Sequence, residues 1–307
     1  MTLASCGKKD DPTPQKKPED VVKDSAYVVR VMQFNILASD PENEGHKWHN
    51  DRKEPCLNML RKVKPDVIAL EEVRKGGVNA QDPVPNQYDE LLLAFPDYTS
   101  VQFPKNGNKN SAGQRNMIMW KKSKLELVSW GKYWFSKDRT SDSSLSNMFN
   151  DPDAAQKMTV WAKFKNKATG NIFWVYCTHF FASVKYIETR EKCVDISIES
   201  IRSEVGEKGT VFLCGDLNFN YLEDGPRESL QPLFNYMKWS AQEAPKTHGV
   251  RSPTYNRFGV GTPAILDYIF YRNATPINYY VEDGHLYGTY YISDHYPVYS
   301  DFLLPEK

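Results

Sequence analysis

The sequence predicts a sandwich of two β-sheets in the α/β or α+β class. Apolar runs of strand length outnumber helical patterns along the 307 residues. Long helical patterns occur only early and midway, at 51–64 and 186–205. A single all-parallel sheet would need a helix after nearly every strand. The many strands and few long helices therefore favour two sheets packed face to face.

The first elements of this fold are a strand and a helix. Residues 27–34 (Tyr-Val-Val-Arg-Val-Met-Gln-Phe) predict a strand that ends at Asn35. In 51–64, apolar residues recur at helical spacing until Pro65 ends the pattern.

The next apolar run, 66–70, predicts a short strand whose tip carries Glu71 and Glu72. The segments that follow complete the first half of the predicted fold: a helix over 87–95, a strand over 98–103, a loop over 104–114 and a strand over 116–120.

A long loop and a strand pair are predicted in the middle of the chain. Residues 136–156 are dense in Ser, Asp and Asn, which is typical of a surface loop. Residues 158–164 and 172–178 predict two strands joined by a turn near 168–170. His179 falls at the tip of the second strand.

A long helix over 186–205 precedes a buried strand over 211–214, which we expect Gly215 to break. Asp216 and Asn218 follow on the turn. An acid and an amide here either line a pocket, where they activate water and hold an oxyanion, or form an Asx turn that caps backbone groups. After an irregular stretch, the remaining strands are predicted over 264–271, 277–282 and 296–304.

The composition is typical of a globular protein, with 40% hydrophobic and 25% charged residues. Thirty-nine basic and thirty-nine acidic residues cancel, so a generally basic protein that seeks polyanions is not indicated. The sequence has no internal repeat and no run of about 18 apolar residues that could span a bilayer.

The N-terminus resembles a bacterial lipoprotein signal. Leu3-Ala4-Ser5-Cys6 is similar to a lipobox, in which the cysteine becomes the lipidated first residue, although the apolar stretch that should precede it is absent. We expect 1–24 to be a signal remnant and a flexible tether, and 25–307 to be the folded domain. The protein would then be extracytoplasmic, anchored by lipid to a bacterial outer membrane or cell surface. The alternative is a polar tail with one cysteine.

The other cysteines, Cys56, Cys177, Cys193 and Cys214, match no zinc-binding spacing. Each lies in an apolar helix or strand pattern, so we expect buried thiols. A Cys177–Cys214 disulfide is the alternative if their strands are neighbours in an oxidising compartment.

Polar side chains occur at or near the tips of six predicted strands. They are Asn35, Glu72, His179, Asp216 with Asn218, Asp267, and Asp294 with His295. Carboxylate and amide oxygens suit a hard cation such as Mg²⁺, or alternatively Mn²⁺. Imidazoles can donate to a phosphoryl oxygen in the transition state, and a carboxylate can activate water. The set predicts metal-assisted phosphoester hydrolysis.

Six ordered motifs resemble those of the endonuclease/exonuclease/phosphatase superfamily, which has the deoxyribonuclease I-like fold. They are Gln33-Phe34-Asn35-Ile36-Leu37, Leu70-Glu71-Glu72-Val73, Thr178-His179-Phe180, Gly215-Asp216-Leu217-Asn218, Leu266-Asp267-Tyr268-Ile269 and Ser293-Asp294-His295-Tyr296-Pro297-Val298. The resemblance covers about residues 26 to 304. It implies a four-layer sandwich of two mixed, mostly antiparallel sheets with helices outside.

The resemblance implies a metal site, and at that site this sequence departs from the family pattern at one position. Glu72 would be the principal metal ligand, with Asn35 beside it and Asp294 completing the metal-binding rim. The family usually has Gln-Glu where this chain has Glu71-Glu72. Glu71 would then either add negative charge near the metal or point away from the site. Because it adjoins Glu72, it is also the alternative ligand.

The resemblance also implies catalytic roles. Asp216 would activate the water, and Asn218 would hold both Asp216 and the scissile phosphate. His295, oriented by Asp267, and His179 would act on the phosphate.

Two further residues are expected to support substrate binding. Arg190 falls where the family often has an arginine that supports the site. Secreted relatives often carry an arginine shortly before the strand at 158–164, where this chain has Gln156-Lys157. Lys157 would contact phosphate as a point charge, without the two-pronged geometry of arginine.

The expected function is that of a divalent-metal-dependent phosphoester hydrolase, phosphodiesterase- or nuclease-like. One alternative is a phosphomonoesterase of the same superfamily that acts on sugar, inositol or lipid phosphates. Another is a non-catalytic surface lipoprotein that binds a ligand. Candidate substrates are small phosphodiesters, lipid headgroups, phosphorylated sugars and oligonucleotides. No obligate protein partner is expected, membrane contact would be through the lipid only, and the chain is expected to be a monomer.

Overall fold

The computed structural model describes residues 26–39, 45–76, 86–105, 112–136, 139, 157–182, 187–249, 252–282 and 287–306. Cys6, the tether predicted over 1–24, and most of the loops predicted at 104–114 and 136–156 lie outside these residues.

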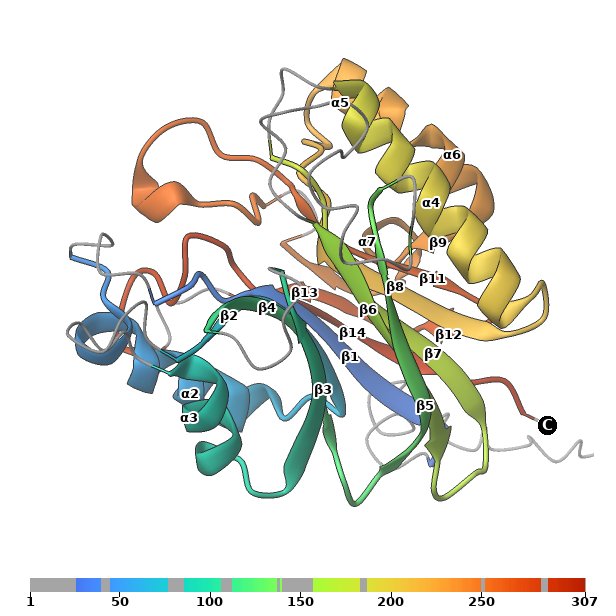
Figure 1. Cartoon of the computed structure of the whole chain (residues 1–307), viewed down its shortest axis with the longest axis horizontal. Coiled ribbons are helices and arrows are strands. Elements are labelled where there is room, and N and C mark those ends of the chain that lie inside the picture. The colour runs from blue at the N-terminus through green and yellow to red at the C-terminus, as the bar shows by residue number, and fades with distance from the viewer. Residues whose placement is uncertain are drawn as a thin grey trace, which may run out of the picture.

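Two β-sheets stack face to face in this structure (Figure 1). The first sheet has the strand order β10-β13-β14-β1-β2-β4-β3, with β12 beside β14. Its strands are β1 (Val28–Asn35), β2 (Val67–Lys75), β3 (Tyr98–Pro104), β4 (Gly113–Lys121), β10 (Thr247–His248), β12 (Thr275–Pro276), β13 (Tyr279–Val281) and β14 (Val298–Leu303).

The second sheet has the order β5-β6-β7-β8-β11-β9. Its strands are β5 (Leu125–Trp134), β6 (Met158–Asn166), β7 (Ile172–His179), β8 (Thr210–Asp216), β9 (Lys238–Trp239) and β11 (Asp267–Arg272). The predicted two-sheet sandwich of the deoxyribonuclease I-like type is confirmed.

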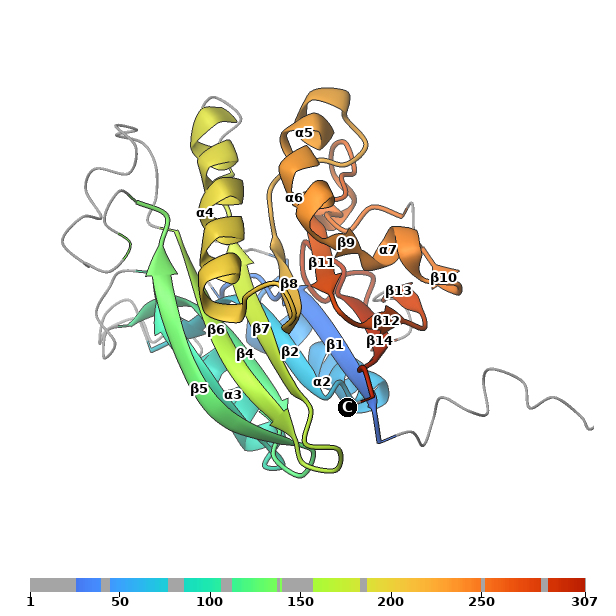
Figure 2. The same ribbon diagram turned by 90° about the vertical axis from the view of Figure 1, so that its right-hand side faces the viewer.

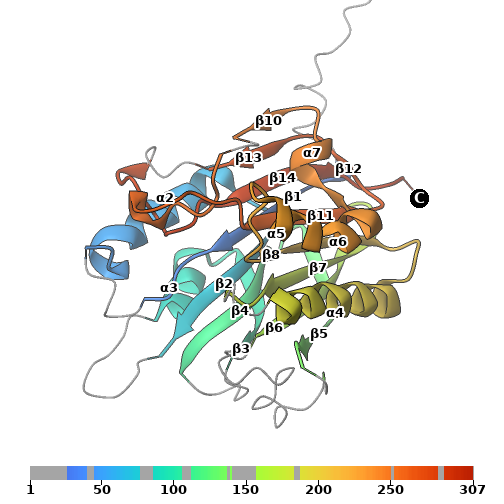
Figure 3. The same ribbon diagram turned by 90° about the horizontal axis from the view of Figure 1, so that it is seen from above.

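Helices cover both outer faces of the sandwich (Figures 1 and 2). A π-helical turn, η1 (Trp48–Arg52), leads into α2 (Lys53–Val63), which packs with α3 (Gln87–Ala94) on the first sheet. The helices over and beside the second sheet are α4 (Ile187–Val205), α5 (Asp224–Ser229), α6 (Gln231–Tyr236) and α7 (Ser240–Glu243). Figure 3 shows α2 and α3 far from α4 and α6. None of the described helices is long and apolar enough to cross a membrane.

The alternation of side chains along β1 separates two hydrophobic cores. Val29 and Val31 belong to the core between the sheets, whereas Met32 and Phe34 pack under α2 and α3. Because successive side chains point to opposite faces, Gln33 and Asn35 continue the row that faces the second sheet. The alternation along β1 therefore directs Gln33 and Asn35 toward the second sheet.

Gly215 does not break its strand, contrary to the prediction. β8 continues to Asp216, and β7 pairs with it in parallel through Thr178 and Gly215. A Cβ on Gly215 would lie 2.0 Å from the Thr178 carbonyl oxygen. Glycine is therefore needed there for close approach of two strands and not for a turn.

All four described cysteines are free, buried thiols. Cys177 and Cys214 are direct partners across the β7–β8 ladder, so the strands are neighbours as the disulfide alternative required. The structure nevertheless has thiols at both positions, and burial raises the pKa of each well above its usual range.

Candidate active site

The strand directions bring the predicted site residues to one edge of the sandwich. β1 and β2 are parallel, as are β7 and β8, so each pair delivers its carboxyl ends together. β11 is antiparallel to β8 and places Asp267 opposite Asp216. β14 is antiparallel to β1, so the residues just before β14 return to the same edge. Segments distant in sequence thus meet at the carboxyl ends of the central strands.

A cleft of about 530 Å³ opens at this edge. Most of the predicted site residues line it: Asn35, Glu72, His179, Arg190, Asp216, Asn218, Asp294 and His295. Asp267 and Lys157 are not on its wall. A smaller cavity of about 350 Å³, between α5, α6 and α7, contains none of these residues.

The Asp216 carboxylate lies at the centre of the cleft wall. Its Oδ2 is 3.2 Å from Asn35 Nδ2, 3.5 Å from His179 Nε2 and 3.6 Å from His295 Nε2. Its Oδ1 accepts a hydrogen bond of 3.0 Å from the Asn218 backbone, so the Asx turn forms as well. Burial raises the pKa of Asp216 to about 6, against the opposing charge of His295. A carboxylate with this pKa is suited to take a proton near neutral pH.

His295 is held as the cationic imidazole of the site. Its Nδ1 donates to Asp267 Oδ2 over 2.8 Å, and the Tyr255 ring packs against it at 4.7 Å. Burial disfavours its charge, but Asp267 and Asp216 raise the pKa of His295 well above its usual range. Its Nε2–H therefore points a positive charge toward the Asp216 side of the cleft.

His179 is held as the neutral imidazole. Burial, Lys157 and Lys105 lower the pKa of His179 well below its usual range. Lys105 Nζ lies 3.3 Å from His179 Nδ1, and an ammonium group can only donate there. The ring proton must then be on Nε2, facing Asp216. His179 can therefore donate a hydrogen bond to a phosphoryl oxygen.

Lys105 is a site residue that the sequence did not reveal. It falls in the predicted loop over 104–114, among one other lysine and three asparagines that give no local signal. Only the pairing of β3 with β4, which carries Lys105 next to Gln114, places it beside His179.

A backbone irregularity separates the roles of Glu71 and Glu72. The β2–β4 register shifts between Leu70 and Val73, and Glu72 has a left-handed φ of 62°. This bulge turns Glu72 into the cleft, where Asn35 Nδ2 lies 3.4 Å from its Oε1. Burial favours the neutral acid, but Lys105 and Lys157 lower the pKa of Glu72 below its usual range. Left-handed non-glycine residues commonly mark functional sites.

Glu71 lies on the opposite side, between the sheets, with no exposed surface. It accepts a hydrogen bond of 3.0 Å from Gln33 Nε2, and burial raises its pKa well above the usual range. The structure thus has Glu72 on the cleft wall and Glu71 behind it.

Asn218 and Arg190 form one unit at the cleft wall. Asn218 is left-handed (φ 54°), and its side chain donates to the Phe180 carbonyl over 3.1 Å. Arg190 donates to the Asn218 carbonyl and stacks on Phe219 at 4.5 Å, while its Nε has no partner. Arg190 therefore supports the turn that carries Asn218.

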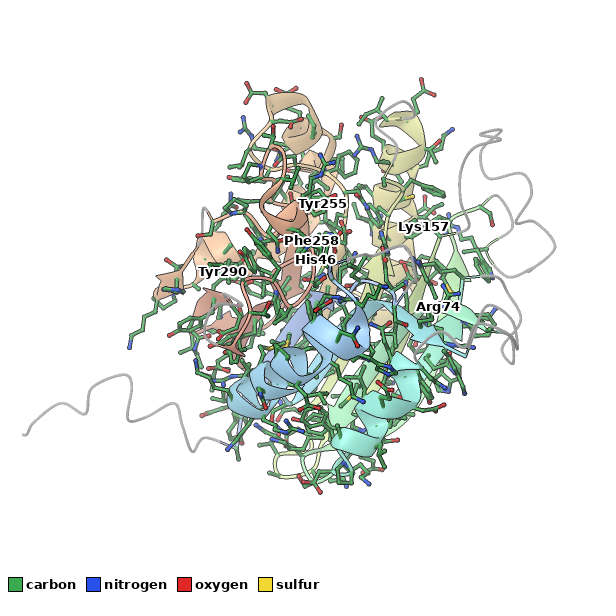
Figure 4. All side chains as sticks on the ribbon, turned by 90° about the vertical axis from the view of Figure 1, so that its left-hand side faces the viewer. His46, Arg74, Lys157, Tyr255, Phe258 and Tyr290 are labelled. Atoms are coloured by element: carbon green, nitrogen blue, oxygen red, sulfur yellow. The ribbon has the colours of Figure 1, made fainter. Side chains whose placement is uncertain are left out.

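Lys157 lies just before β6 and is buried next to the site (Figure 4). Burial and Lys105 lower its pKa to about 7, against the opposing charges of Glu72 and Asp216. Figure 4 shows Lys157 apart from His46 and Phe258. The His46 and Phe258 rings stack in parallel at 3.6 Å.

The outer part of the cleft is formed by residues that the sequence did not single out as site residues. They are Asn220, Glu223, Tyr255, Arg257 and Thr262. Tyr255 packs on His295 and also lines the cleft.

The donors near Glu72 fit a hard cation. They are the carboxylates of Glu72 and Asp294, with Asp216 adjacent. The Asn35 amide turns its Nδ2 toward Glu72 and Asp216, and its Oδ1 accepts a hydrogen bond of 3.2 Å from the Leu37 backbone. Burial raises the pKa of Asp294, although His295 opposes this. In the described part of the chain, no three His, Cys, Asp or Glu side chains are grouped so that they could hold a metal ion. Mg²⁺ seldom needs such a group, because it keeps waters and substrate phosphate oxygens in its shell.

Comparison with known proteins connects these residues to a family. The model of the Endonuclease/Exonuclease/phosphatase family matches residues 32–295. A search of curated proteins finds no match.

Several solved structures share the fold. An endonuclease/exonuclease/phosphatase from Bacteroides vulgatus has a TM-score of 0.76 at 24% identity, covering 91% of this chain and 99% of its own. A mannosyl-6-phosphatase from Bacteroides thetaiotaomicron has a TM-score of 0.72 at 18% identity, covering 90% and 100%. Danio rerio TDP2, complexed with a single-strand DNA product, has a TM-score of 0.63 at 17% identity, covering 90% and 98%.

Proposed function

The chain belongs to the endonuclease/exonuclease/phosphatase family, and from this membership and the cleft we propose that it is a divalent-metal-dependent phosphoester hydrolase. Members of this family are phosphoesterases and nucleases. The observation that carries the proposal is the position of Asp216, whose Oδ2 faces Asn35 and both imidazoles in one cleft. The metal dependence and the substrate are the parts of the proposal to be tested.

In the proposed mechanism, Asp216 orients a water and takes its proton as the water attacks phosphorus. Its raised pKa makes it an effective base near neutral pH. His295 and His179 donate through their Nε2–H groups to phosphoryl oxygens as negative charge grows on them. Asn218 holds the turn beyond β8, so that the base stays in register with the phosphate.

Glu72 and Asp294 would hold the metal, and Mg²⁺ or Mn²⁺ suits their oxygen donors. Asn35 would join them by turning its amide, so that Oδ1 in place of Nδ2 faces Glu72. Such an ion neutralises phosphate charge and helps to orient the ester. Lys157 and Lys105 would add positive charge near Glu72, as the lowered pKa of that carboxyl reflects.

The cleft favours a small phosphoester over duplex nucleic acid. A volume of about 530 Å³ is the size of a site for a small molecule. The outer wall carries one carboxylate, Glu223, hydrogen-bonded at 2.8 Å to Asn220, and one guanidinium, Arg257, and so is not the uniformly basic surface that a duplex backbone needs. The mannosyl-6-phosphatase among the structural neighbours makes a sugar phosphomonoester the second candidate, beside a small phosphodiester.

Hydrolysis of generic esters tests the proposal. Purified protein is incubated with bis-p-nitrophenyl phosphate or p-nitrophenyl phosphate, each with Mg²⁺, Mn²⁺ or EDTA. We expect turnover that EDTA abolishes and that Asp216→Asn and His295→Ala each reduce by at least about 100-fold. Faster cleavage of the diester supports a phosphodiesterase, and faster cleavage of the monoester supports a phosphatase.

Glu228→Gln is the matched control, because this exposed acid on α5 does not line the cleft. It should retain wild-type turnover. Turnover that survives EDTA, or that persists in Asp216→Asn, would contradict the proposal.

The location of the protein remains a separate proposal. The similarity of Leu3-Ala4-Ser5-Cys6 to a lipobox supports an extracytoplasmic, lipid-anchored protein. Metabolic labelling with a palmitate analogue, with an apolar signal stretch placed before Leu3 in a bacterial host, should label the wild-type chain and not Cys6→Ser. Equal labelling of the two would exclude the anchor.

A further inference from the structure

A chain of buried polar side chains crosses from the first sheet to the second behind the cleft. Gln33 Nε2, on β1, donates to Glu71 Oε2 over 3.0 Å and to Asp267 Oδ1 over 2.9 Å. The other oxygen of Asp267, Oδ2, meets His295 Nδ1 at 2.8 Å. One amide group thus bridges two acids, and the second acid holds the cationic imidazole of the site.

Because these side chains are buried, the fold is destabilised unless their polar atoms are hydrogen-bonded to one another. Gln33, Glu71 and Asp267 have no exposed surface and lie between the two sheets. A polar group that is buried without a hydrogen-bond partner destabilises a protein by about 1–3 kcal/mol. Both N–H groups of the Gln33 amide are used, whereas its Oε1 has no partner. The reverse amide orientation would turn that oxygen toward both carboxyl groups and leave neither with a donor from Gln33.

Strand geometry explains how these side chains meet. Gln33 follows Val29 and Val31 on the inward row of β1, and Glu71 follows Ala69 on the inward row of β2. The bulge at Glu72 comes one residue later and turns only that side chain into the cleft. The adjacent acids therefore lie on opposite sides of the cleft wall: Glu72 faces the cleft, and Glu71 lies between the sheets.

Glu71 is fixed from the second sheet as well. The Cys177 sulfur on β7 lies 3.4 Å from Glu71 Oε1 and 3.3 Å from the Leu70 carbonyl oxygen. Glu71 therefore has a partner on each of its oxygens and cannot turn toward the cleft without losing both. Because Glu71 cannot rotate, the acceptor that it offers to Gln33 Nε2 stays in place.

We propose that Gln33 and Glu71 are positioning residues, in which Glu71 anchors Gln33 and Gln33 fixes the Asp267 carboxylate so that Oδ2 faces His295. The proposal rests on the phosphoester hydrolase function only for its kinetic tests. Neither residue touches the cleft, so each acts through Asp267. Partners of this indirect kind typically change activity by about 10- to 100-fold when they are removed.

The first test compares kcat and KM in single variants of the full chain. Gln33→Met removes the bridge at nearly constant volume, and we expect kcat to fall about tenfold with KM changed less than about twofold. Glu71→Met should lower kcat in the same direction, and Glu71→Gln, which restores an oxygen acceptor for Gln33 Nε2, should recover most of that loss. A change confined to KM, or no recovery with glutamine, would overturn the proposal.

A matched control lies at the far side of the first sheet. Asn278 is also a buried amide that donates to a buried carboxylate, Asp301 Oδ2, over 2.7 Å. Asn278→Leu should lower the thermal midpoint without lowering kcat. If it lowers kcat as much as Gln33→Met does, the effect of Gln33 is one of general stability and the proposal fails.

A double-mutant cycle separates positioning from general disturbance. Asp267→Asn removes the charge that Gln33 is proposed to position. Adding Gln33→Met to Asp267→Asn should then lower kcat by less than about twofold, because residues that act as a unit are not additive. A further tenfold loss in the double variant would contradict the proposal.

The last measurement requires no substrate, so it decides the proposal even if no phosphoester is hydrolysed. The ring Nδ1–H of His295 that donates to Asp267 should give a strongly downfield proton resonance with ¹⁵N-labelled histidine. Gln33→Met should shift this resonance upfield or speed its exchange with water, and Asn278→Leu should not. If Gln33→Met does not fold, Gln33→Asn, which is one methylene shorter, replaces it. An unchanged resonance would refute the positioning role.

Discussion

At the scale of one residue, the proposed catalytic base Asp216 destabilises the folded protein when it is ionised. Its carboxyl is buried, and its pKa is raised to about 6 because burial favours the neutral acid. At a pH above that value the folded protein must hold a buried charge that the unfolded chain exposes to water. The same environment that makes Asp216 a useful base therefore destabilises the native state.

Replacing this acid should stabilise the protein in a pH-dependent way. The pKa of Asp216 is about 6 when folded, and about 4 in an unfolded chain. Below pH 4 both states are protonated and no penalty exists; the penalty grows between pH 4 and 6 and is constant above. In EDTA, Asp216→Asn should therefore have a free energy of unfolding about 3 kcal/mol higher than wild type at pH 8, and less than about 0.5 kcal/mol higher at pH 4. Urea denaturation at both pH values measures this, and equal differences at both would refute it.

Glu72 and Glu71 form a natural pair for testing the metal site. Glu72 lines the cleft, whereas Glu71 is enclosed between the sheets. Glu72→Gln should weaken Mg²⁺ binding by at least about tenfold, and Glu71→Gln should change it by less than about threefold. Calorimetric titration with MgCl₂, without substrate, makes the comparison. Equal losses in both variants, or none in Glu72→Gln, would remove Glu72 from the proposed metal site.

At the scale of elements, the β7–β8 ladder depends on the absence of a side chain at one position. A Cβ on Gly215 would lie 2.0 Å from the Thr178 carbonyl oxygen and 2.7 Å from Thr178 Cγ2. Because the obstacle is backbone, the strands would have to separate where they carry His179 and Asp216. Gly215→Ala should therefore destabilise the fold by more than about 2 kcal/mol, measured by urea denaturation.

Gly225 in α5 provides the control for this prediction. A Cβ there would meet nothing within 4 Å. Gly225→Ala should be neutral or stabilise by up to about 1 kcal/mol, because alanine has less freedom to lose on folding. If both alanine variants behave alike, crowding against Thr178 is not the reason for glycine at 215.

Elements that bury a regular apolar face were predictable from the sequence, and the others were not. The strand predicted over 27–34 and the helix over 186–205 correspond to β1 and α4, which are extensively buried. β5 was missed because it is an edge strand that exposes most of its middle residues and so has no apolar run. α5 was missed because Asp-Gly-Pro-Arg-Glu-Ser buries no residue and contains both helix-disfavouring types.

The residues of the candidate site were also only partly predictable from the sequence. Motif residues such as His179 and Asp216 stand at strand ends, where polar side chains after apolar runs are visible in the sequence. Lys105 and Gln33 take part only through contacts 74 and 234 residues away along the chain, with His179 and Asp267. No local pattern encodes such a pairing. Gly215 was misread because a glycine required by a neighbouring strand looks the same in sequence as one required by a turn.

At the scale of the whole molecule, the fold is closed by its two terminal strands. β1 and β14, from the two ends of the described chain, are antiparallel neighbours inside the first sheet. Arg30 on β1 joins this pair: its Nε and Nη2 donate to the two carboxylate oxygens of Asp301 over 2.7 and 2.8 Å. Its Nη1 donates to the Val63 carbonyl over 2.7 Å, which ties the end of α2 to the same point.

Removing this junction should destabilise the entire domain and not one end of it. Asp301 is only 5% exposed, so Arg30→Met leaves a carboxylate with little access to water. We expect a loss of about 2–3 kcal/mol in a single cooperative transition by both tryptophan fluorescence and circular dichroism. Arg61→Met is the control, because Arg61 and Glu54 form an exposed pair at 3.8 Å, and it should change stability by less than about 0.5 kcal/mol. Transitions that separate between the two probes would mean that the terminal strands unfold independently, which their position in the centre of the sheet argues against.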